Sequence, residues 1–318
     1  SASNETVGKD TYRELLVKSA SARQIAAYVY SSAGEGESTQ DLVFGGDNII
    51  AENGTVLARA KRFETGVIYA DLDIHRLSHE RRRMRTYQGE NLREHQILPV
   101  HMEEEETFLE RRFSARPFVP DEAQEREKRC DEILSIQSCG LKKRYEHTGC
   151  QSAVLGISGG LDSTLAVLVT VRAFDLLGLE RNKITSVTMP CFGTTDRTYD
   201  NACRLARLLG TTLREVDIRE AVNVHFRDIG QSDACHDVTY ENGQARERTQ
   251  VLMDIANQTG GLVIGTGDMS ELALGWATYN GDHMSMYGVN AGVPKTLVRH
   301  LVRYYADTCG EDALKELL

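Results

Sequence analysis

A short segment with two adjacent glycines follows an apolar run near the middle of the chain. The apolar run ends at Ile157, Ser158-Gly159-Gly160 predicts a tight turn, and apolar residues at helical spacing begin at Leu161. Glycines let the backbone approach a ligand closely, and the first turn of a helix offers free N–H groups and the positive end of its dipole to an anion. The segment therefore predicts a phosphate-binding loop, to which Ser163 and Thr164 add hydroxyl donors.

Two acidic residues follow two predicted strands and are candidate metal ligands. Asp162 stands where the Walker phosphate loop has its lysine, and a carboxylate beside phosphates is favourable when Mg²⁺ lies between them. Glu271 lies about one helical turn after Gly265-Thr266-Gly267, so a shared sheet edge would bring it to the same ion. The alternative for both residues is a solvated carboxylate that interacts with a helix dipole.

Three further segments are candidate ligand contacts, each with a structural alternative. The loop over residues 188–195 would accommodate an adenine ring or would be a plain connection after a strand. Trp276 and Tyr279 would stack on a planar heterocycle, although an isolated tryptophan in a loop is more often a packing residue. Lys295 begins a predicted helix, where its ammonium would neutralise phosphates or be solvated.

The length and composition limit the class of protein. A chain of 318 residues predicts about two domains, and it contains no apolar run long enough to span a membrane. The net charge of −10 argues against a surface that coats nucleic acid, so phosphate binding would come from local loops and metal. The seven cysteines never form a Cys-x-x-Cys pair, which favours reduced thiols and a cytoplasmic location over a zinc site or a disulfide framework.

The first part of the chain has a strand-like pattern and is followed by a charged segment. We expect a helix over residues 10–20, strands over 24–30, 47–51 and 67–73, and a type I′ hairpin turn at Asn53-Gly54. The stretch 75–127 is dense in arginine and glutamate, which predicts a solvated helical or connecting segment rather than a specific binding site. The expected domains are residues 1–90, a charged connector over 91–120, and a second domain over 121–318.

From residue 121 the pattern alternates between apolar strands and amphipathic helices. The expected strands are residues 153–157, 184–189, 213–218 and 262–265. Continuous apolar strands separated by helices imply a parallel sheet that is covered on both faces, with ligands at the carboxyl ends of the strands. The expected fold class is therefore α/β, with a doubly wound parallel sheet.

Four motifs in this order carry a resemblance to a known family. They are Ser-Gly-Gly-Leu-Asp-Ser at 158–163, Tyr-Glu-Asn-Gly-Gln-Ala-Arg-Glu-Arg-Thr at 240–249, Gly-Thr-Gly-Asp-Met-Ser-Glu-Leu-Ala-Leu-Gly-Trp at 265–276 and Val-Asn-Ala-Gly-Val-Pro-Lys-Thr at 289–296. The first resembles the pyrophosphate loop of the ATP-pyrophosphatases, which adenylate a carboxylate or a carbonyl oxygen. Together the motifs resemble the glutamine-dependent NAD synthetases over nearly all of the chain.

The resemblance implies an enzyme of two domains. Its fold would be a synthetase domain of the adenine nucleotide alpha-hydrolase-like type, preceded by part of a nitrilase-like α/β glutaminase domain. Its activity would be the ATP-dependent amidation of deamido-NAD to NAD through an NAD-adenylate, with ammonia supplied from glutamine by the linked glutaminase. ATP and Mg²⁺ would be the cofactors. The partners would be deamido-NAD, ATP, glutamine or ammonia, and further copies of the chain in a homo-oligomer, without nucleic acid or membrane.

Residues at matching motif positions take the family's roles by resemblance. The ATP contacts would be Gly156, Ile157, Ser158, Gly159, Gly160, Leu161, Asp162, Ser163, Thr266 and Lys295. The deamido-NAD contacts would be Asn242, Glu271, Trp276, Ala277, Thr278 and Tyr279. Asp162 and Glu271 would hold the Mg²⁺ ion.

The resemblance also predicts what the chain does not contain. Nitrilase-like glutaminases use a glutamate, a lysine and a cysteine nucleophile, and in the family all three precede the segment that matches Ser1. The family also continues past the position of Leu318, with a C-terminal lysine that contacts the substrate. We therefore expect this sequence to be a portion of a longer polypeptide, without a glutaminase nucleophile of its own.

Two alternative functions remain open from the sequence. One is another member of the same superfamily, such as a GMP synthetase or a tRNA-modifying ligase. The acidic charge disfavours the tRNA-modifying ligase, and the stretch 267–279 disfavours both. The other alternative is a non-catalytic nucleotide-binding or assembly module.

Overall fold

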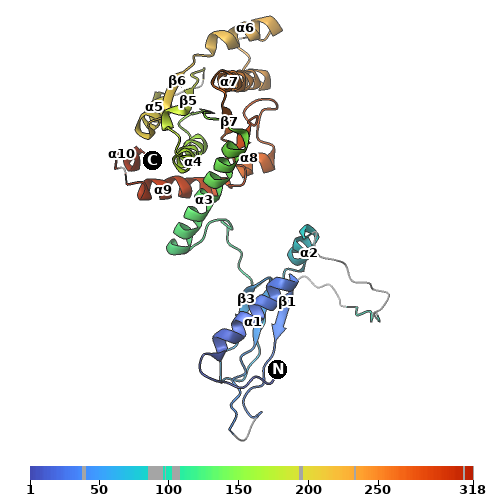
Figure 1. Cartoon of the computed structure of the whole chain (residues 1–318). Coiled ribbons are helices and arrows are strands. Elements are labelled where there is room, and N and C mark those ends of the chain that lie inside the picture. Colours follow the sequence, from blue (N-terminus) through green and yellow to red (C-terminus); the bar gives the residue numbers. More distant parts are fainter. Residues whose placement is uncertain are drawn as a thin grey trace. The chain divides into compact units, whose positions relative to one another are not determined.

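Figure 1 shows the computed structural model of the chain, whose elements fall into two compact units. The structure describes residues 1–37, 41–84, 96, 98–101, 108–192, 196–232, 234–310 and 312–317. The first unit spans Ser1–Ser114 and the second spans Ala115–Leu318. Part of the connector predicted over 91–120 lies outside the described residues.

The first unit contains a three-stranded antiparallel sheet with a helix packed on it. Its elements are α1 (Lys9–Gln24), β1 (Ala27–Tyr30), β2 (Ile49–Glu52), β3 (Thr55–Arg59) and α2 (Ile74–Arg83). The strand order is β1-β2-β3, and Val17 of α1 shares a buried cluster with Ile49 and Ala51 of β2. The helix predicted over 10–20 and the strands predicted over 24–30 and 47–51 are confirmed, with shifted ends.

The turn between β2 and β3 has the predicted hairpin geometry. Asn53 and Gly54 have φ angles of 44° and 83°. A type I′ turn needs positive φ at both central residues, which asparagine tolerates and glycine adopts freely. The Asn-Gly pair therefore predicted this hairpin correctly.

The strand predicted over 67–73 is wrong. The structure assigns these residues to irregular backbone, and the side chains of Val67 and Tyr69 are 74% and 81% exposed. Apolar and aromatic residues favour an extended backbone, but a strand also needs a neighbour for its ladder of hydrogen bonds. Side chains hold the segment instead, since Asp71 accepts hydrogen bonds from the backbone N–H groups of Glu110 and Arg111 at 2.8 Å.

A buried ion-pair cluster joins α1 to the sheet of the first unit. Arg13 of α1 is 3% exposed and donates to Asp47 at 2.6 Å, and Arg59 of β3 donates to both oxygens of Asp47 at 2.8 Å. Burial acts to raise the pKa of Asp47, but the hydrogen bonds from Arg59 and Arg13 outweigh it and hold the pKa below its usual value. Asp47 therefore stays ionised between the two arginines.

The second unit is built on a five-stranded sheet in which every paired neighbour is parallel. The strands are β4 (Ala153–Gly156), β5 (Ile184–Thr188), β6 (Thr212–Glu215), β7 (Leu262–Gly265) and β8 (Tyr287–Gly288), in the order β6-β5-β4-β7-β8. The helices are α3 (Ala123–Thr148), α4 (Leu161–Leu177), α5 (Asp196–Leu209), α6 (Arg219–Ile229), α7 (Val238–Thr259), α8 (Met269–Leu274), α9 (Lys295–Thr308) and α10 (Asp312–Leu317), with a short 3₁₀ turn over Arg181–Lys183. Within the described ranges, none of the helices combines the length and the apolar character needed to cross a lipid bilayer.

Both faces of this sheet are covered, as the alternation of strands and helices predicted. Leu155 of β4 packs on one face in the main buried cluster, which also takes residues from α3, α4, α5 and α9. The next residue toward the N-terminus, Val154, points into a second cluster with Ile255 and Ala256 of α7. Because successive strand residues face opposite sides, these two clusters lie on opposite faces. The doubly wound α/β fold is therefore confirmed.

The direction of the strand order reverses between β4 and β7, where the sequence motifs converge. The chain runs from β4 outward to β5 and β6 on one side, and then to β7 and β8 on the other side. Helices that follow β4 and β7 therefore leave these adjacent strands in opposite directions. Ligands of open α/β sheets bind at such a switch point, outside the carboxyl ends of the strands.

Candidate functional site

The glycine segment after β4 forms a tight turn that leads into α4. Gly159 has a φ of 77°, a left-handed conformation that glycine adopts without steric cost. A Cβ atom on Gly159 would lie 2.2 Å from the carbonyl oxygen of Thr198 in α5, so the close approach of loop and helix requires glycine. The hydroxyls of Ser158 and Ser163 lie 3.3 Å apart, and Ser163 donates to the carbonyl oxygen of Gly160 at 3.0 Å. These bonds close the turn around the N-terminus of α4, where an anion would bind.

Three carboxylates from two adjacent strand ends meet at the switch point. Asp162 lies in the first turn of α4, after β4, whereas Asp268 and Glu271 lie at the start of α8, after β7. One oxygen of each residue lies within 4.8 Å of the others. The structure therefore brings Asp162 and Glu271 together and adds Asp268 to them.

A capping box fixes Asp268 and Glu271 at the start of α8. Asp268 Oδ1 accepts hydrogen bonds from the backbone N–H groups of Ser270 and Glu271 at 2.7 and 3.0 Å. In return, Glu271 Oε2 accepts from the backbone N–H of Asp268 at 3.1 Å. One oxygen of each side chain is thus used for capping, and the other, Oδ2 of Asp268 and Oε1 of Glu271, faces the cluster.

Lys295, the first residue of α9, supplies a positive charge among the three carboxylates. Its Nζ lies 2.5 Å from Asp162 Oδ2, 3.2 Å from Asp268 Oδ2 and 3.6 Å from Glu271 Oε1. Partial burial acts to lower the pKa of Lys295, but hydrogen bonds with Asp162 and Asp268 outweigh it and hold the pKa above its usual value. The ammonium therefore stays charged within the cluster.

The donor set of this cluster fits a hard divalent cation. Asp162 Oδ1 is a buried oxygen that has no hydrogen-bond partner among the described residues, and the ammonium of Lys295, 3.2 Å away, is the cation beside the buried Asp268 Oδ2. Buried carboxylate oxygens without such partners are costly unless a cation compensates them. Oxygen ligands of this kind are the ones that Mg²⁺ prefers.

The segment with the two exposed aromatic residues follows α8 directly and is tied to α7. The backbone N–H of Trp276 donates to the carbonyl oxygen of Glu271 at 2.9 Å, and Thr278 Oγ1 donates to Asn242 Oδ1 at 2.7 Å. The side chains of Trp276 and Tyr279 are 79% and 74% exposed. The side chain of Trp276 is therefore not buried among the described residues.

The remaining sequence candidates lie at the same edge of the sheet. Gly156 is the last residue of β4, Ile157 to Gly160 form the turn, and Leu161 begins α4. Thr266 lies in the loop between β7 and α8, and its carbonyl oxygen accepts a hydrogen bond from Asn290 at 3.1 Å. Ala277 is exposed between Trp276 and Thr278.

The loop after β5, which was predicted to accommodate adenine, is described as far as Phe192, and residues 193–195 lie outside the described residues. The ring of Phe192 stacks on Tyr240 of α7 with centroids 5.9 Å apart. Cys191 is buried beside Ile218 and Val222, and burial raises the pKa of its thiol. The described part of the loop is thus anchored on α6 and α7.

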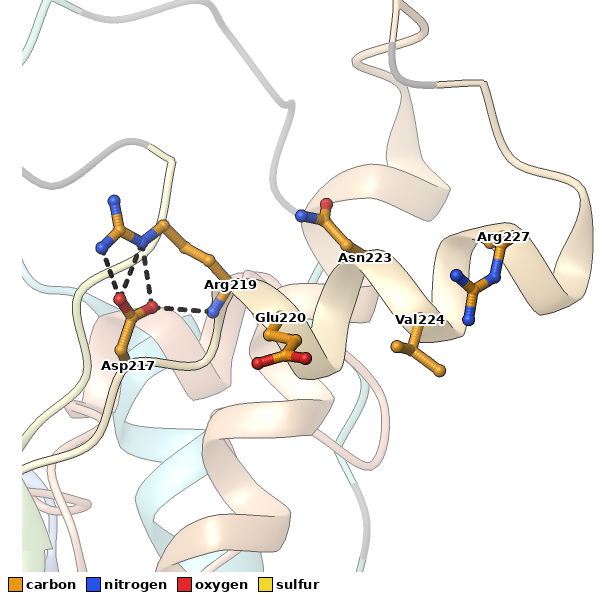
Figure 2. Close-up of a pocket in the computed structure, with 6 residues that line it drawn as sticks. All are labelled: Asp217, Arg219, Glu220, Asn223, Val224 and Arg227. Atoms are coloured by element: carbon orange, nitrogen blue, oxygen red, sulfur yellow. Dashed lines mark hydrogen bonds and ion pairs between the residues drawn. The ribbon is translucent and has the colours of Figure 1, made fainter.

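A separate surface hollow of about 500 Å³ lies along α6 and contains none of the predicted site residues (Figure 2). Its lining residues are Asp217, Arg219, Glu220, Asn223, Val224 and Arg227. Figure 2 shows Arg219 folded back onto Asp217, and hydrogen bonds from the side chain and backbone of Arg219 lower the pKa of Asp217 to about 2. Asp217 and Arg219, two of the charged residues of this hollow, are therefore paired with each other.

Sequence reasoning missed two residues of the site. Asp268 had a usable signal, because Asp268-Met269-Ser270-Glu271 has the spacing of a capping box before an apolar run. Asn290, which contacts the backbone of both carboxylate-bearing segments, lies in the fourth motif, but a single asparagine among small residues is typical of any loop and did not indicate that role.

A family model and curated relatives match most of this chain. A protein-family model, NAD synthase, matches residues 133–315. The glutamine-dependent NAD(+) synthetase of Mycobacterium leprae is 46% identical over 96% of this chain, and that of Thermotoga maritima is 30% identical over 99%. The chain spans about half the length of these curated relatives, 47% and 53% respectively.

Solved structures show the same fold. A glutamine-dependent NAD+ synthetase from Acinetobacter baumannii, in complex with adenosine diphosphate, has a TM-score of 0.56 and 24% identity over 99% of this chain and 52% of its own. An NH3-dependent NAD synthetase from Campylobacter jejuni has a TM-score of 0.50 and 26% identity over 59% of this chain and 77% of its own. With the motifs, the switch-point cluster and the family match in agreement, the chain belongs to the NAD synthase family.

Proposed function

We propose that this chain carries the synthetase part of an enzyme that converts deamido-NAD to NAD with ATP and ammonia. The observation that supports this most directly is the group of Asp162, Asp268, Glu271 and Lys295 at the switch point, beside the glycine turn. Nucleotidyl transfer needs aligned reactants and neutralised charge more than it needs a protein nucleophile. A site of glycines, carboxylates and one lysine suits that requirement.

The proposed reaction has two steps. An oxygen of the nicotinate carboxylate attacks the α-phosphorus of ATP, the bond from that phosphorus to the bridging oxygen breaks, and pyrophosphate leaves with the electron pair. Ammonia then attacks the carbonyl carbon of the NAD-adenylate and AMP leaves with the electron pair of the carbon–oxygen bond. The nitrogen loses one proton to solvent and becomes the amide of NAD.

Each part of the site has a role in the first step. The backbone N–H groups of the turn and of the first turn of α4 would hold the pyrophosphate oxygens, with Thr266 as a further ATP contact. Asp162, Asp268 and Glu271 would hold Mg²⁺, which when bound neutralises phosphate charge and polarises the phosphoryl group. Lys295 would add a second positive charge to the phosphate oxygens.

The exposed segment after α8 would bind deamido-NAD. Trp276, Ala277, Thr278 and Tyr279 offer two aromatic faces beside a backbone that Asn242 fixes through Thr278. Glu271 would contact both this substrate and the ion, since its helix leads into the segment.

We also propose that the first unit is part of a nitrilase-like glutaminase that supplies the ammonia, with the domain boundary within residues 91–120, and that the enzyme works as a homo-oligomer. The relatives whose names include glutamine-dependence match this chain over 95% or more of its length, which includes the first unit.

The test is pyrophosphate release from ATP and Mg²⁺, measured with ammonium in the presence and in the absence of deamido-NAD. We expect release only with deamido-NAD, and NAD as the second product. Release that requires xanthosine monophosphate in place of deamido-NAD would instead identify a GMP synthetase. Binding of ATP without any turnover would identify a nucleotide-binding module.

Two aspartates of α4 provide a matched pair of variants for this assay. Asp162→Asn removes a carboxylate of the cluster, and we expect a loss of about 100-fold or more in pyrophosphate release, as for other groups that stabilise developing charge. Asp175 lies at the other end of the same helix, where its exposed carboxylate pairs with Arg181. Asp175→Asn removes that carboxylate. We expect that control to stay within about twofold of the wild-type rate.

A further inference from the structure

Asn290 is a fully buried polar residue in the loop between β8 and α9. Its side chain is 0% exposed, and its neighbours in the sequence, Val289 and Ala291, belong to a short loop of small and apolar residues. A buried amide is costly unless its hydrogen-bonding groups are satisfied. The position of Asn290 therefore depends on the groups that surround it.

The amide of Asn290 joins three separate segments of the second unit. Its Nδ2 donates to the carbonyl oxygen of Asp162 at 2.9 Å and to the carbonyl oxygen of Thr266 at 3.1 Å. Its Oδ1 accepts from Nε2 of Gln137 in α3 at 3.2 Å, and the same nitrogen of Gln137 donates to the carbonyl oxygen of Val289 at 2.9 Å. Both protons of the Asn290 amide are thus used, one on each of two strand–helix connections.

These two connections are the ones that carry the carboxylates. Asp162 offers its carbonyl oxygen to Asn290 and its side-chain oxygen to the cluster, so the amide holds the backbone of a candidate ligand. Thr266 lies two residues before Asp268, the N-cap of α8. The helices that begin at these connections leave β4 and β7 in opposite directions. A link between the first turn of α4 and the loop before α8 therefore limits the separation of the carboxylates.

Lys295 also links the two connections, but through charge. Its ammonium contacts Asp162 and Asp268 directly, so any cation or phosphate that enters the cluster competes with these contacts. The Asn290 amide is neutral, is directed at backbone oxygens and lies outside the carboxylate cluster. Its link therefore persists when the charges of the site change.

We infer that Asn290, supported by Gln137, is a positioning residue that sets the distance between Asp162 and the Asp268–Glu271 pair and thereby the affinity of the site for a divalent cation. This inference rests on the metal role proposed above for those carboxylates. Partners that orient metal ligands typically change metal affinity by 10–100-fold when they are removed. We expect a change of that size for Asn290 without any change in the ligands themselves.

The test uses Mn²⁺ as the probe, because its binding is measured by electron paramagnetic resonance without turnover. We compare the whole chain with its Asn290→Ala, Gln137→Met, Asp162→Asn and Thr170→Val variants. Thr170→Val is the matched control, since Thr170 is 0% exposed in α4 and its hydroxyl donates to the carbonyl oxygen of Ala166 in the same helix at 2.7 Å. We expect Asn290→Ala to weaken Mn²⁺ binding at least tenfold, Gln137→Met to weaken it less, and Thr170→Val to leave it unchanged.

A second measurement separates positioning from a general loss of structure. If Asn290 acts on the ion site, raising the Mg²⁺ concentration should restore most of the synthetase rate of Asn290→Ala, whereas a partly unfolded protein would not recover. Should Asn290→Ala fail to fold, Gln137→Met carries the comparison, because it removes the support of the amide and leaves the amide in place.

The outcomes distinguish this inference from the proposed function. Wild-type affinity for Mn²⁺ in folded Asn290→Ala, together with loss of binding in Asp162→Asn, overturns the positioning role and leaves the metal site standing. Equal weakening in Asn290→Ala and Thr170→Val also overturns it. Absence of Mn²⁺ binding in the wild type removes both the metal site and the inference built on it.

Discussion

Substitution of Gly159 by alanine tests whether the glycine turn packs too closely against α5 to accept a side chain. Gly159 has a positive φ, and a Cβ atom there would lie 2.2 Å from the carbonyl oxygen and 2.9 Å from the carbonyl carbon of Thr198. Ordinary contacts of a Cβ atom begin at 3.4 Å, so either the turn or the first turn of α5 must move. Both contacts are with backbone atoms, which cannot rotate away as a side chain would.

The size of the effect follows from two separate costs. Alanine in the left-handed region costs about 1–2 kcal/mol relative to glycine. Forcing an extra carbon into a packed contact costs a further ~1–3 kcal/mol. We therefore expect Gly159→Ala to lower the free energy of unfolding of the second unit by about 2–5 kcal/mol, and to weaken ATP binding because the turn is displaced.

Gly178 provides the control that separates the two costs. It is the C-cap of α4, with a φ of 68°, and a Cβ atom there would meet nothing within 4 Å. Gly178→Ala should therefore lose only the ~1–2 kcal/mol of backbone strain and should keep its ATP affinity.

Urea unfolding followed by far-ultraviolet circular dichroism measures the stability of both variants, and calorimetry measures ATP binding. If the two variants lose the same free energy of unfolding and bind ATP equally well, then α5 moves away from the turn without loss of stability. The reasoning from the close contact would then be wrong.

Two further predictions concern the exposed aromatic segment and the ion-pair cluster of the first unit. Trp276→Ala should weaken the binding of deamido-NAD by about 1–3 kcal/mol, the range for a base stacked on an aromatic ring, and should weaken the binding of ATP much less. Calorimetry with each ligand measures both affinities, and Leu274→Ala, at another exposed position, is the control. Equal weakening of the two affinities would argue against stacking. Asp47 has a pKa held below its unfolded value, so its stabilising contribution is present above about pH 4 and is lost as the pH falls through the folded pKa. Hydrogen exchange of α1 and β2 should therefore accelerate in acid, and Asp47→Asn should weaken that dependence. The substitution should cost about 1.5–3 kcal/mol at pH 7, because Arg13 and Arg59 lose a charged hydrogen-bond partner but keep Glu5 and Glu14. An unchanged acid profile in Asp47→Asn would show that another group controls it.

Much of the second unit was predictable because its signals are local. The strand ending at Gly156, the turn at Ser158-Gly159-Gly160 and the helix from Leu161 follow from apolar runs and glycines that neighbour each other in the sequence. The strand predicted over 213–218 instead spans Thr212–Glu215, because Ile218 is the N-cap of the next helix. The strand ends three residues earlier than predicted because the apolar residues Val216 and Ile218 suit a buried loop as well as a strand.

The parts that could not be predicted depend on contacts between distant segments. β8 has two residues, too few to show any alternation, and it exists because Ile264 and Gly265 pair with it in parallel. The irregular backbone over 67–73 has the composition of a strand but has no sheet neighbour in the described unit. In both cases the available neighbour, rather than the residues themselves, decides the structure.

The charge balance of the switch point connects the fold to the proposed chemistry. Asp162, Asp268 and Glu271 lie within 4.8 Å of one another, and Lys295 neutralises one of their three negative charges. Like charges at this separation repel unless cations or dipoles compensate them, and the N-termini of α4 and α8 supply only part of that compensation. The two charges that remain equal the charge of one divalent cation. A sheet that turns two helix N-termini toward one point thus gathers the carboxylates that the proposed function assigns to an ion, and Asn290 joins the first turn of α4 to the loop before α8 through backbone oxygens.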